Sequence, residues 1–358
     1  MSSLSRGARL VQDCVTRFGL DLTDLTVYTE AASGPYLYTP LVAAAAGAEE
    51  VIAVTADSIY ATAADVAGAT SAAAAELDLA TRIHITERGR PDEVGRSDIV
   101  TNTGFVRPID AALVSMMKRT AVVPLMWETW ELRASEVDLA SCRRHGILVL
   151  GTDEGRAPLD FHPYLGLVAL KVLFELSLEA YRTRVLLLGT GEVFGASIAA
   201  SLTRAGATVD WYSADSRGGR YDDLASYWDE HGHEVDALIL AEHRSPRPLI
   251  GPGGYLSYES LRARRPDLGV GVIAGHHDPD GLLGSGLRTF PGRIRPFGYM
   301  SYQPSDLGPR PVLELYAAGL RVGQEMARAR LRGLGLDDAR DYALARSPAM
   351  GFHVREVG

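Results

Sequence analysis

The chain has 358 residues, and its 36 Lys and Arg against 45 Asp and Glu give a formal charge of −9 at pH 7. A protein this acidic lacks the positive field with which proteins bind nucleic acids. Its hydrophobic content of 46% is enough for a packed core, and no apolar stretch reaches the ~20 residues that a membrane span requires. We therefore expect a globular protein of about two domains, with neither nucleic acid nor membrane among its partners.

The N-terminal region and the cysteines bear on the compartment. Residues 1–10 carry Arg6 and Arg9 but no apolar block of the kind that secretory signal peptides contain. The two cysteines, Cys14 and Cys142, cannot form a disulfide framework. We expect a cytoplasmic protein.

Short β-branched runs alternate with helical patterns along the chain, which is typical of parallel βαβ units. The strands predicted for a first sheet are 25–29, 51–55, 82–86, 99–102, 121–125 and 147–150. Those predicted for a second sheet are 184–188, 208–212, 237–241 and 270–274. The pattern predicts an α/β fold with two doubly wound, Rossmann-like parallel-sheet domains and a cleft between them.

Two long helical patterns suggest how the domains are connected. Residues 163–181 are predicted to form an interdomain helix, and residues 312–334 a second long helix that returns to the first domain. The first, discontinuous domain is then 1–160 plus about 318–358, and we expect it to bind substrate. Residues 161–317 form the expected dinucleotide-binding domain.

The sharpest motif is a glycine-rich turn between a predicted strand and a predicted helix. Such a turn lets a pyrophosphate approach the backbone, and the helix N-terminus supplies N–H donors to the phosphates. Its G-x-G-x-x-x-G spacing is one residue longer than the commonest form. The alternative is an ordinary glycine-rich turn. The cofactor-binding residues expected here are Gly189, Thr190, Gly191, Glu192, Val193 and Gly195.

The end of the second strand of this domain bears on the choice between NAD and NADP. An acidic residue there usually binds the adenosine ribose of NAD, but the position falls on Ser213, with Asp215 and Ser216 following. Arg217 or Arg220 could pair with the 2′-phosphate of NADP. The sequence favours NADP slightly over NAD, although Asp215 could still reach the ribose.

The stretch 137–152 resembles the linker region of the D-2-hydroxyacid dehydrogenase (formate/glycerate dehydrogenase-like) family. There too a short helix leads into a strand that ends in Thr, here Thr152, before a long helix and the glycine-rich turn. The order of elements from about 97 to 320 is also similar. The resemblance implies a nucleotide domain inserted into a substrate domain, NAD(P) as cofactor and a homodimer.

The sequence departs from this family at the residues that perform its chemistry. The family's substrate-clamping Arg is replaced by Gly275-His276-His277, and its Glu and His find no counterpart in 289–302. The family's substrate therefore cannot be carried over. A group that moves a proton near neutral pH is still needed, and the candidates are His276, His277, Tyr299 and His162. Adjacent histidines point apart, so we predict no metal site.

Other strand ends supply further candidates. Glu242 and His243 follow the strand 237–241, where they could border the cofactor or simply hold the loop. In the first domain, Glu30 could hold a substrate amine, and the resemblance implies that backbone amides after the strand 99–102 contact a substrate carboxylate. Ser33 could instead be a helix cap. The substrate-binding residues expected are Glu30, Ser33, Asn102, Thr103, Gly104, Arg107 as an anion clamp, and Trp127.

These features predict an NAD(P)-dependent oxidoreductase that acts on a small polar carbonyl, alcohol or imine in the interdomain cleft. One alternative is a non-redox enzyme with tightly bound NAD, as in adenosylhomocysteine hydrolase-like proteins. The other is a non-catalytic dinucleotide-binding protein, which the missing family residues suggest.

Overall fold

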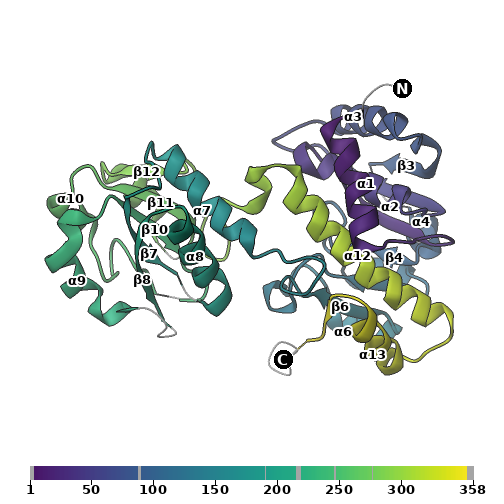
Figure 1. The fold of residues 1–358 in the computed structure, drawn as a ribbon. Helices are drawn as coiled ribbons and strands as arrows, with labels where there is room; N and C mark the ends of the chain where they lie inside the picture. Colours follow the sequence, from purple (N-terminus) through teal and green to yellow (C-terminus); the bar gives the residue numbers. More distant parts are fainter. Residues whose placement is uncertain are drawn as a thin grey trace. The chain divides into compact units, whose positions relative to one another are not determined.

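The computed structural model describes residues 4–87, 90–189, 191–214, 219–245, 247–275 and 277–352. The chain divides into two compact units (Figure 1), one formed by Met1–Asp160 with Gly308–Gly358 and the other by Phe161–Leu307. Each unit has one mainly parallel sheet with helices on both faces. The predicted fold class of two doubly wound α/β sheets is confirmed.

The sheet of the first unit has seven strands in the order β13-β6-β5-β4-β1-β2-β3. All neighbours pair in parallel except β13, which pairs antiparallel with β6. The chain winds outward from β1 in one direction and from β4 in the other, so the carboxyl ends of these two strands form a topological switch point. The strands are β1 (Thr26–Glu30), β2 (Glu50–Val54), β3 (Ile83–Thr86), β4 (Ile99–Val100), β5 (Val122–Pro124), β6 (Leu148–Thr152) and β13 (Ala349–Met350).

Helices cover both faces of this sheet. Val94 of α4, Val114 of α5 and Cys142 of α6 pack on one face of the sheet. Helix α12 contacts β4, β5 and β6, and α1 and α2 contact α12. Figure 1 shows α1 and α12 side by side. A Cβ on Gly323 of α12 would lie 2.9 Å from Pro124, so this glycine permits close packing. The helices are α1 (Arg6–Phe18), η1 (Gly34–Tyr38), α2 (Thr39–Ala45), α3 (Ala63–Glu76), η2 (Ala80–Arg82), α4 (Pro91–Arg96), α5 (Ala111–Met116), η3 (Thr129–Glu131), α6 (Leu139–His145), α12 (Pro309–Leu331) and α13 (Leu336–Arg346).

The sheet of the second unit has six strands in the order β12-β11-β10-β7-β8-β9, all parallel. Numbered within the unit, this is the order 6-5-4-1-2-3 of the doubly wound nucleotide-binding fold, with its switch point between β7 and β10. The strands are β7 (Arg184–Leu188), β8 (Thr208–Ser213), β9 (Gly219–Arg220), β10 (Ala237–Ala241), β11 (Gly269–Ala274) and β12 (Arg288–Phe290).

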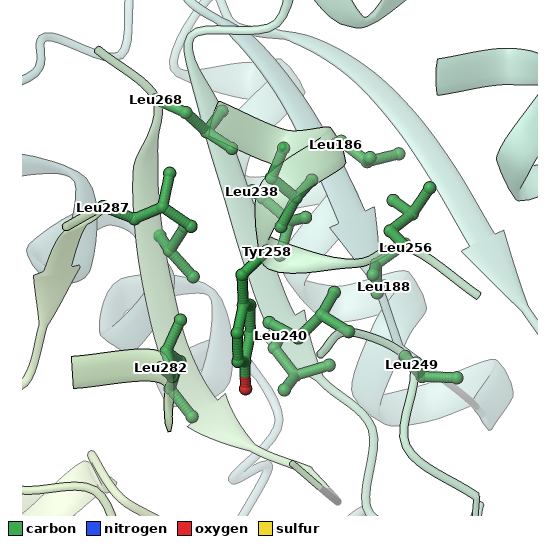
Figure 2. Packing of buried hydrophobic residues seen from close by; sticks show 14 of the residues in the cluster. Leu186, Leu188, Leu238, Leu240, Leu249, Leu256, Tyr258, Leu268, Leu282 and Leu287 are labelled. Carbon is green, nitrogen blue, oxygen red and sulfur yellow. The ribbon is translucent and has the colours of Figure 1, made fainter. Parts of the chain in front are cut away.

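Alternation along β7 builds a core on each face of this sheet. Val185 and Leu187 pack with α7 and α8, and Leu186 and Leu188 pack with α9, α10 and α11. Figure 2 shows the hydrophobic cluster that contains Leu186 and Leu188, in which Leu238 and Leu240 lie near Tyr258. The helices are α7 (Pro163–Glu175), η4 (Gly191–Gly195), α8 (Ala196–Arg204), η5 (Tyr221–Asp223), α9 (Leu224–His231), η6 (Gly232–Glu234), α10 (Tyr258–Arg264), α11 (Pro279–Gly284) and η7 (Pro304–Leu307).

Two predicted helices have different bounds in the structure. The helix expected over 163–181 ends at Glu175, because Ser177 has a left-handed φ of 57°. The helix expected over 312–334 begins at Pro309 instead; proline is tolerated in a first turn, where its missing N–H has no helical acceptor. Among the described residues, no helix is long and apolar enough to cross a lipid bilayer.

Candidate functional site

The glycine-rich turn joins β7 to α8 at the switch point of the second sheet. Residues Gly191–Gly195 form a π-helical turn, which accommodates one residue more than an α-turn does and so absorbs the extra residue of the motif. A Cβ on Gly195 would lie 2.7 Å from the carbonyl oxygen of Gly189, and a Cβ on Gly189 would lie 3.0 Å from the carbonyl oxygen of Ala241. Side chains at these two positions are therefore excluded by neighbouring backbone.

Gly191 gives the turn its positive φ of 105°, which favours glycine. It is buried, and a Cβ placed on it would lie 3.9 Å from Cε1 of His243. The imidazole of His243 also packs against Phe194, with 5.0 Å between ring centroids. Burial, followed by the charge of Arg244, lowers the pKa of His243 below its ordinary value. His243 is thus a predominantly neutral ring beside the turn.

Trp211, in the middle of β8, contacts the same turn. Its indole Nε1 donates a hydrogen bond to the carbonyl oxygen of Gly189 at 2.7 Å. The indole also lies where a Cβ on Gly195 would be only 2.9 Å from its ring. Because the Gly189 carbonyl is bonded to the indole, it is held toward β8. Trp211 was not predicted from the sequence, since a tryptophan in a strand is usually explained by packing.

The carboxyl end of β10 carries Glu242, which is fully buried. One carboxylate oxygen accepts from the backbone N–H groups of Arg244 at 2.6 Å and Ser245 at 3.1 Å, and the other accepts from the hydroxyl of Tyr221. In the structure Glu242 therefore holds the loop that carries His243, and its contact with a cofactor stays a prediction.

The remaining predicted cofactor residues differ in what the structure shows. Ser213 is buried at the end of β8 and pairs in register with Arg220 of β9. Val193 is 45% exposed in the turn, and the backbone of Glu192 belongs to the same turn. Thr190, Asp215, Ser216 and Arg217 lie outside the described residues.

The predicted proton-transfer residues come from separate segments of the second unit. His277 is buried after β11, and its Nδ1 lies 2.8 Å from the carbonyl oxygen of Gly275. A carbonyl can only accept, so Nδ1 carries the proton and Nε2 of the neutral ring is the acceptor. His162 is half-buried at the start of α7, and Tyr299 is 48% exposed in a turn. His276 lies outside the described residues.

In the first unit, Glu30 ends β1 at the switch point and is 5% exposed. Its Oε2 accepts a hydrogen bond from the backbone N–H of Phe105 at 3.0 Å, and a Cβ on Gly104 would lie 2.9 Å from the same oxygen. Burial raises the pKa of Glu30 above its ordinary value, while the Phe105 amide, the charge of Arg107 and the Gly104 amide act in the opposite direction.

Arg107 is engaged by its own chain. Its Nη1 forms an ion pair with Glu136, and its guanidinium carbon lies 5.1 Å from the centre of the Trp127 ring. Glu136 also accepts from Arg133 at 3.0 Å. Arg107 thus shares the Glu136 carboxylate with Arg133, and its role as an anion clamp stays a prediction. Glu136, 29 positions away, carried no sequence signal for this pairing.

A chain of buried hydroxyl groups lies beside Glu30. Tyr316 donates to Oγ1 of Thr29 at 2.8 Å, Thr101 donates to the same oxygen at 3.0 Å, and the hydroxyls of Thr101 and Thr103 are 2.9 Å apart. Of these residues, only Thr103 was predicted from the sequence. The others lie inside a strand, next to a strand end or inside a helix, where the pattern indicates packing alone.

Asn102 and Ser33 differ from these hydroxyl residues in their contacts. Oδ1 of Asn102 accepts from the backbone N–H of Met126 at 2.9 Å, which links the loops after β4 and β5. Ser33 is the N-cap residue of η1, but its side chain makes no capping hydrogen bond. Among the described residues, no group of three or more His, Cys, Asp or Glu side chains is placed to hold a metal ion.

Comparison with solved structures places this architecture among known folds. A dipicolinate synthase subunit from Bacillus halodurans is 14% identical, with 83% of this chain and 96% of that chain covered at a TM-score of 0.50. A transhydrogenase from Sinorhizobium meliloti is 13% identical, with 90% and 97% covered at a TM-score of 0.50. The chain has the two-unit α/β fold of these proteins, which is the fold expected from the resemblance to the D-2-hydroxyacid dehydrogenases. No family model and no curated protein matches the sequence.

The resemblance inferred from 137–152 is thus confirmed at the level of the fold. In the structure, Asp138 caps α6 by accepting from the backbone N–H of Ser141 at 2.8 Å, Gly146 ends the helix in a left-handed conformation, and β6 follows. The D-2-hydroxyacid dehydrogenase fold carries no substrate with it, because one fold supports many reactions.

Proposed function

We propose that the protein is an NAD(P)-dependent oxidoreductase that acts on a small polar carbonyl, alcohol or imine substrate. The observation that carries the proposal is the turn at Gly189, Gly191 and Gly195, at the switch point of a sheet with the strand order of nucleotide-binding folds. At such a place, backbone N–H groups and the helix N-terminus stabilise phosphate groups.

The described residues fit a dinucleotide diphosphate at this turn. A side chain on Gly189 or Gly195 would clash with backbone, and the positive φ of Gly191 favours a residue without Cβ. The Gly189 carbonyl, which would repel a phosphate, is held by the indole of Trp211. The imidazole of His243 lies beside the turn, with its Cε1 3.9 Å from the position of a Cβ on Gly191.

When bound, NAD(P) supplies the hydride donor or acceptor. The chain must then bind and orient the substrate and move a proton at the substrate oxygen or nitrogen. Among the described residues, His277 suits the proton transfer best, because the Gly275 carbonyl fixes its tautomer and makes Nε2 a proton acceptor. Glu30 and Thr103, at the switch point of the first sheet, are the residues that we propose for substrate recognition.

The test is titration of the full chain with NADH and with NADPH, followed by nicotinamide fluorescence. We expect at least one of them to bind, and the ratio of the two dissociation constants gives the cofactor preference. Binding of neither would overturn the proposal. A substrate screen with the cofactor that binds, in wild type and in His277→Gln, then tests the proton-transfer role; we expect kcat to fall by about 100-fold in the variant.

A further inference from the structure

We propose that the carboxyl edge of the first sheet selects a substrate that presents an ammonium group rather than a carboxylate. This inference rests on the proposed function, since it names the substrate class. Within that class it favours imines in their protonated form, and carbonyl compounds or alcohols that carry an amino group. Three features of the first unit support it.

The first feature is an anion site that the protein fills with its own side chain. Consecutive backbone N–H groups after a strand, here those of Gly104 and Phe105, form a concavity that suits a carboxylate. The Glu30 carboxylate lies there, with its Oε2 3.0 Å from the Phe105 nitrogen and in close approach to Gly104. A substrate carboxylate at these amides would have to displace Glu30 or share a buried space with a like charge, which is strongly unfavourable.

The second feature is the engagement of the neighbouring cation. Arg107 interacts electrostatically with Glu30, yet it pairs with Glu136 and stacks on Trp127. Glu136 is 8% exposed and also binds Arg133. An incoming anion would therefore compete with a partly buried carboxylate for Arg107.

The third feature is the direction of the hydroxyl chain. Thr101 has one hydroxyl proton, and its donor contacts are to Thr29 at 3.0 Å and to the Tyr28 carbonyl at 3.4 Å. When Thr101 donates to either of these acceptors, Thr103 is the donor of the 2.9 Å hydrogen bond between the two threonines. The lone pairs that remain on Thr103, which is 6% exposed, can only accept a hydrogen bond.

Glu30 at the end of β1 presents a negative charge, and Thr103 after the neighbouring strand β4 presents a hydrogen-bond acceptor. An ammonium group offers a positive charge and several N–H donors, which complements both. A carboxylate offers acceptors alone and matches neither. The Glu30 carboxylate attracts an ammonium group through charge-assisted hydrogen bonds, which are about twice as strong as neutral ones, and repels a second carboxylate.

The experiment compares two probes of similar size and opposite charge, propylammonium and propionate, at constant ionic strength. Binding to the full chain is measured by titration calorimetry and by the shift in Tm. We expect propylammonium to bind at least about tenfold more tightly than propionate. Equal binding, tighter binding of propionate, or no binding of propylammonium would overturn the inference.

Two variants locate the effect. Glu30→Gln keeps the shape but removes the charge, and we expect the preference for propylammonium to fall by about tenfold. Glu30→Ala removes the carboxylate from the amides of Gly104 and Phe105, so acetate should raise the Tm of this variant and leave that of wild type unchanged.

If Glu30→Ala does not fold, Glu30→Gln alone decides: an unchanged preference contradicts the inference. Glu259→Gln, on α10 of the second unit, is the matched control and should behave as wild type.

Failure here is distinguishable from failure of the proposed function. Dinucleotide titration tests the turn in the second unit, and the charged probes test the first unit. Dinucleotide binding without a preference for propylammonium would reject this inference alone. A preference for propylammonium without dinucleotide binding would reject the proposed oxidoreductase.

Discussion

The two sheets share one winding order, but the groups at their switch points differ in kind. In the second unit the turn after β7 depends on glycines, and its polar groups are backbone amides. In the first unit the ends of β1 and β4 carry a buried carboxylate and a series of hydroxyls. We propose that the glycine turn of the second unit binds an anionic phosphate and that the carboxylate and hydroxyls of the first unit bind a cationic donor. On this proposal, one winding order carries two switch points of opposite electrostatic preference.

The largest expected effect comes from closing the glycine turn. Gly195→Val places a side chain where a Cβ alone would be 2.7 Å from the Gly189 carbonyl oxygen. Because backbone must move to accept it, we expect affinity for NADH or NADPH to fall by at least about 100-fold, equivalent to about 2.7 kcal/mol. Fluorescence titration measures the loss.

A matched control for this variant lies in the same unit. Gly284 in α11 has nothing within 4 Å of the position of a Cβ, so Gly284→Ala should leave dinucleotide affinity unchanged. Unaltered affinity in Gly195→Val would show that the turn does not hold the cofactor, and the contrast between the two switch points would then be lost.

The second largest expected effect is on how the stability of the first unit depends on pH. Burial raises the pKa of Glu30 in the folded state, although the charge of Arg107 acts to lower it. Burial also raises the pKa of the neighbouring Tyr316, so its hydroxyl is neutral between pH 4.5 and 8. Between the ordinary pKa of a glutamate and the raised one, the folded protein holds more protons than the unfolded chain. Stability from this group is therefore present at low pH and is lost as the pH rises through the folded pKa.

The measurement is urea denaturation of wild type and Glu30→Gln between pH 4.5 and 8. We expect the free energy of unfolding of the variant, relative to wild type, to increase with pH, with a slope of at most about 1.4 kcal/mol per pH unit. Propylammonium binding to wild type should strengthen over the same window as Glu30 ionises. A difference that falls as the pH rises would contradict the assigned direction.

The sequence predicted the repeating elements well because periodicity and turn residues are local properties. Ten strands were expected, and each has a counterpart in the structure. The two-residue strand β9 and the three-residue strand β12 are too short to show a period. The end of α7 was placed too late because Ser177, which adopts the left-handed conformation there, is not a residue type that marks a helix end.

The candidate sites were predictable only in part, for a related reason. Glycines at fixed spacing predict a phosphate turn, but the spacing alone shows neither the π-helical form of that turn nor the close approach of Gly195 to Gly189. The contact between Glu30 and the Phe105 amide joins residues 75 positions apart, and only the parallel pairing of β1 with β4 brings them together. Arg107 was expected to be available because its partner Glu136 had no pattern of its own.

A smaller effect should follow removal of the indole hydrogen bond. Trp211→Phe keeps an aromatic ring in β8 but frees the Gly189 carbonyl, which the indole Nε1 contacts at 2.7 Å. Because that carbonyl could then turn toward the phosphates, we expect about tenfold weaker dinucleotide binding, or about 1.4 kcal/mol. Tyr227→Phe also removes a side-chain hydrogen bond of this unit, to Asp210 at 2.6 Å, and should not change dinucleotide affinity. Equal losses in both variants would argue for a general loss of structure.

The smallest expected effect belongs to the hydroxyl chain. Tyr316→Phe removes the donor that bonds to Thr29 at 2.8 Å inside the first unit. Loss of one buried hydrogen bond should lower the free energy of unfolding by about 1 kcal/mol. Tyr60→Phe, at a position 68% exposed, should cause no measurable change. Dinucleotide affinity should stay at the wild-type value in both variants, because the hydroxyl chain belongs to the first switch point. A fall in that affinity in Tyr316→Phe alone would mean that the two switch points are energetically coupled and do not act as independent sites.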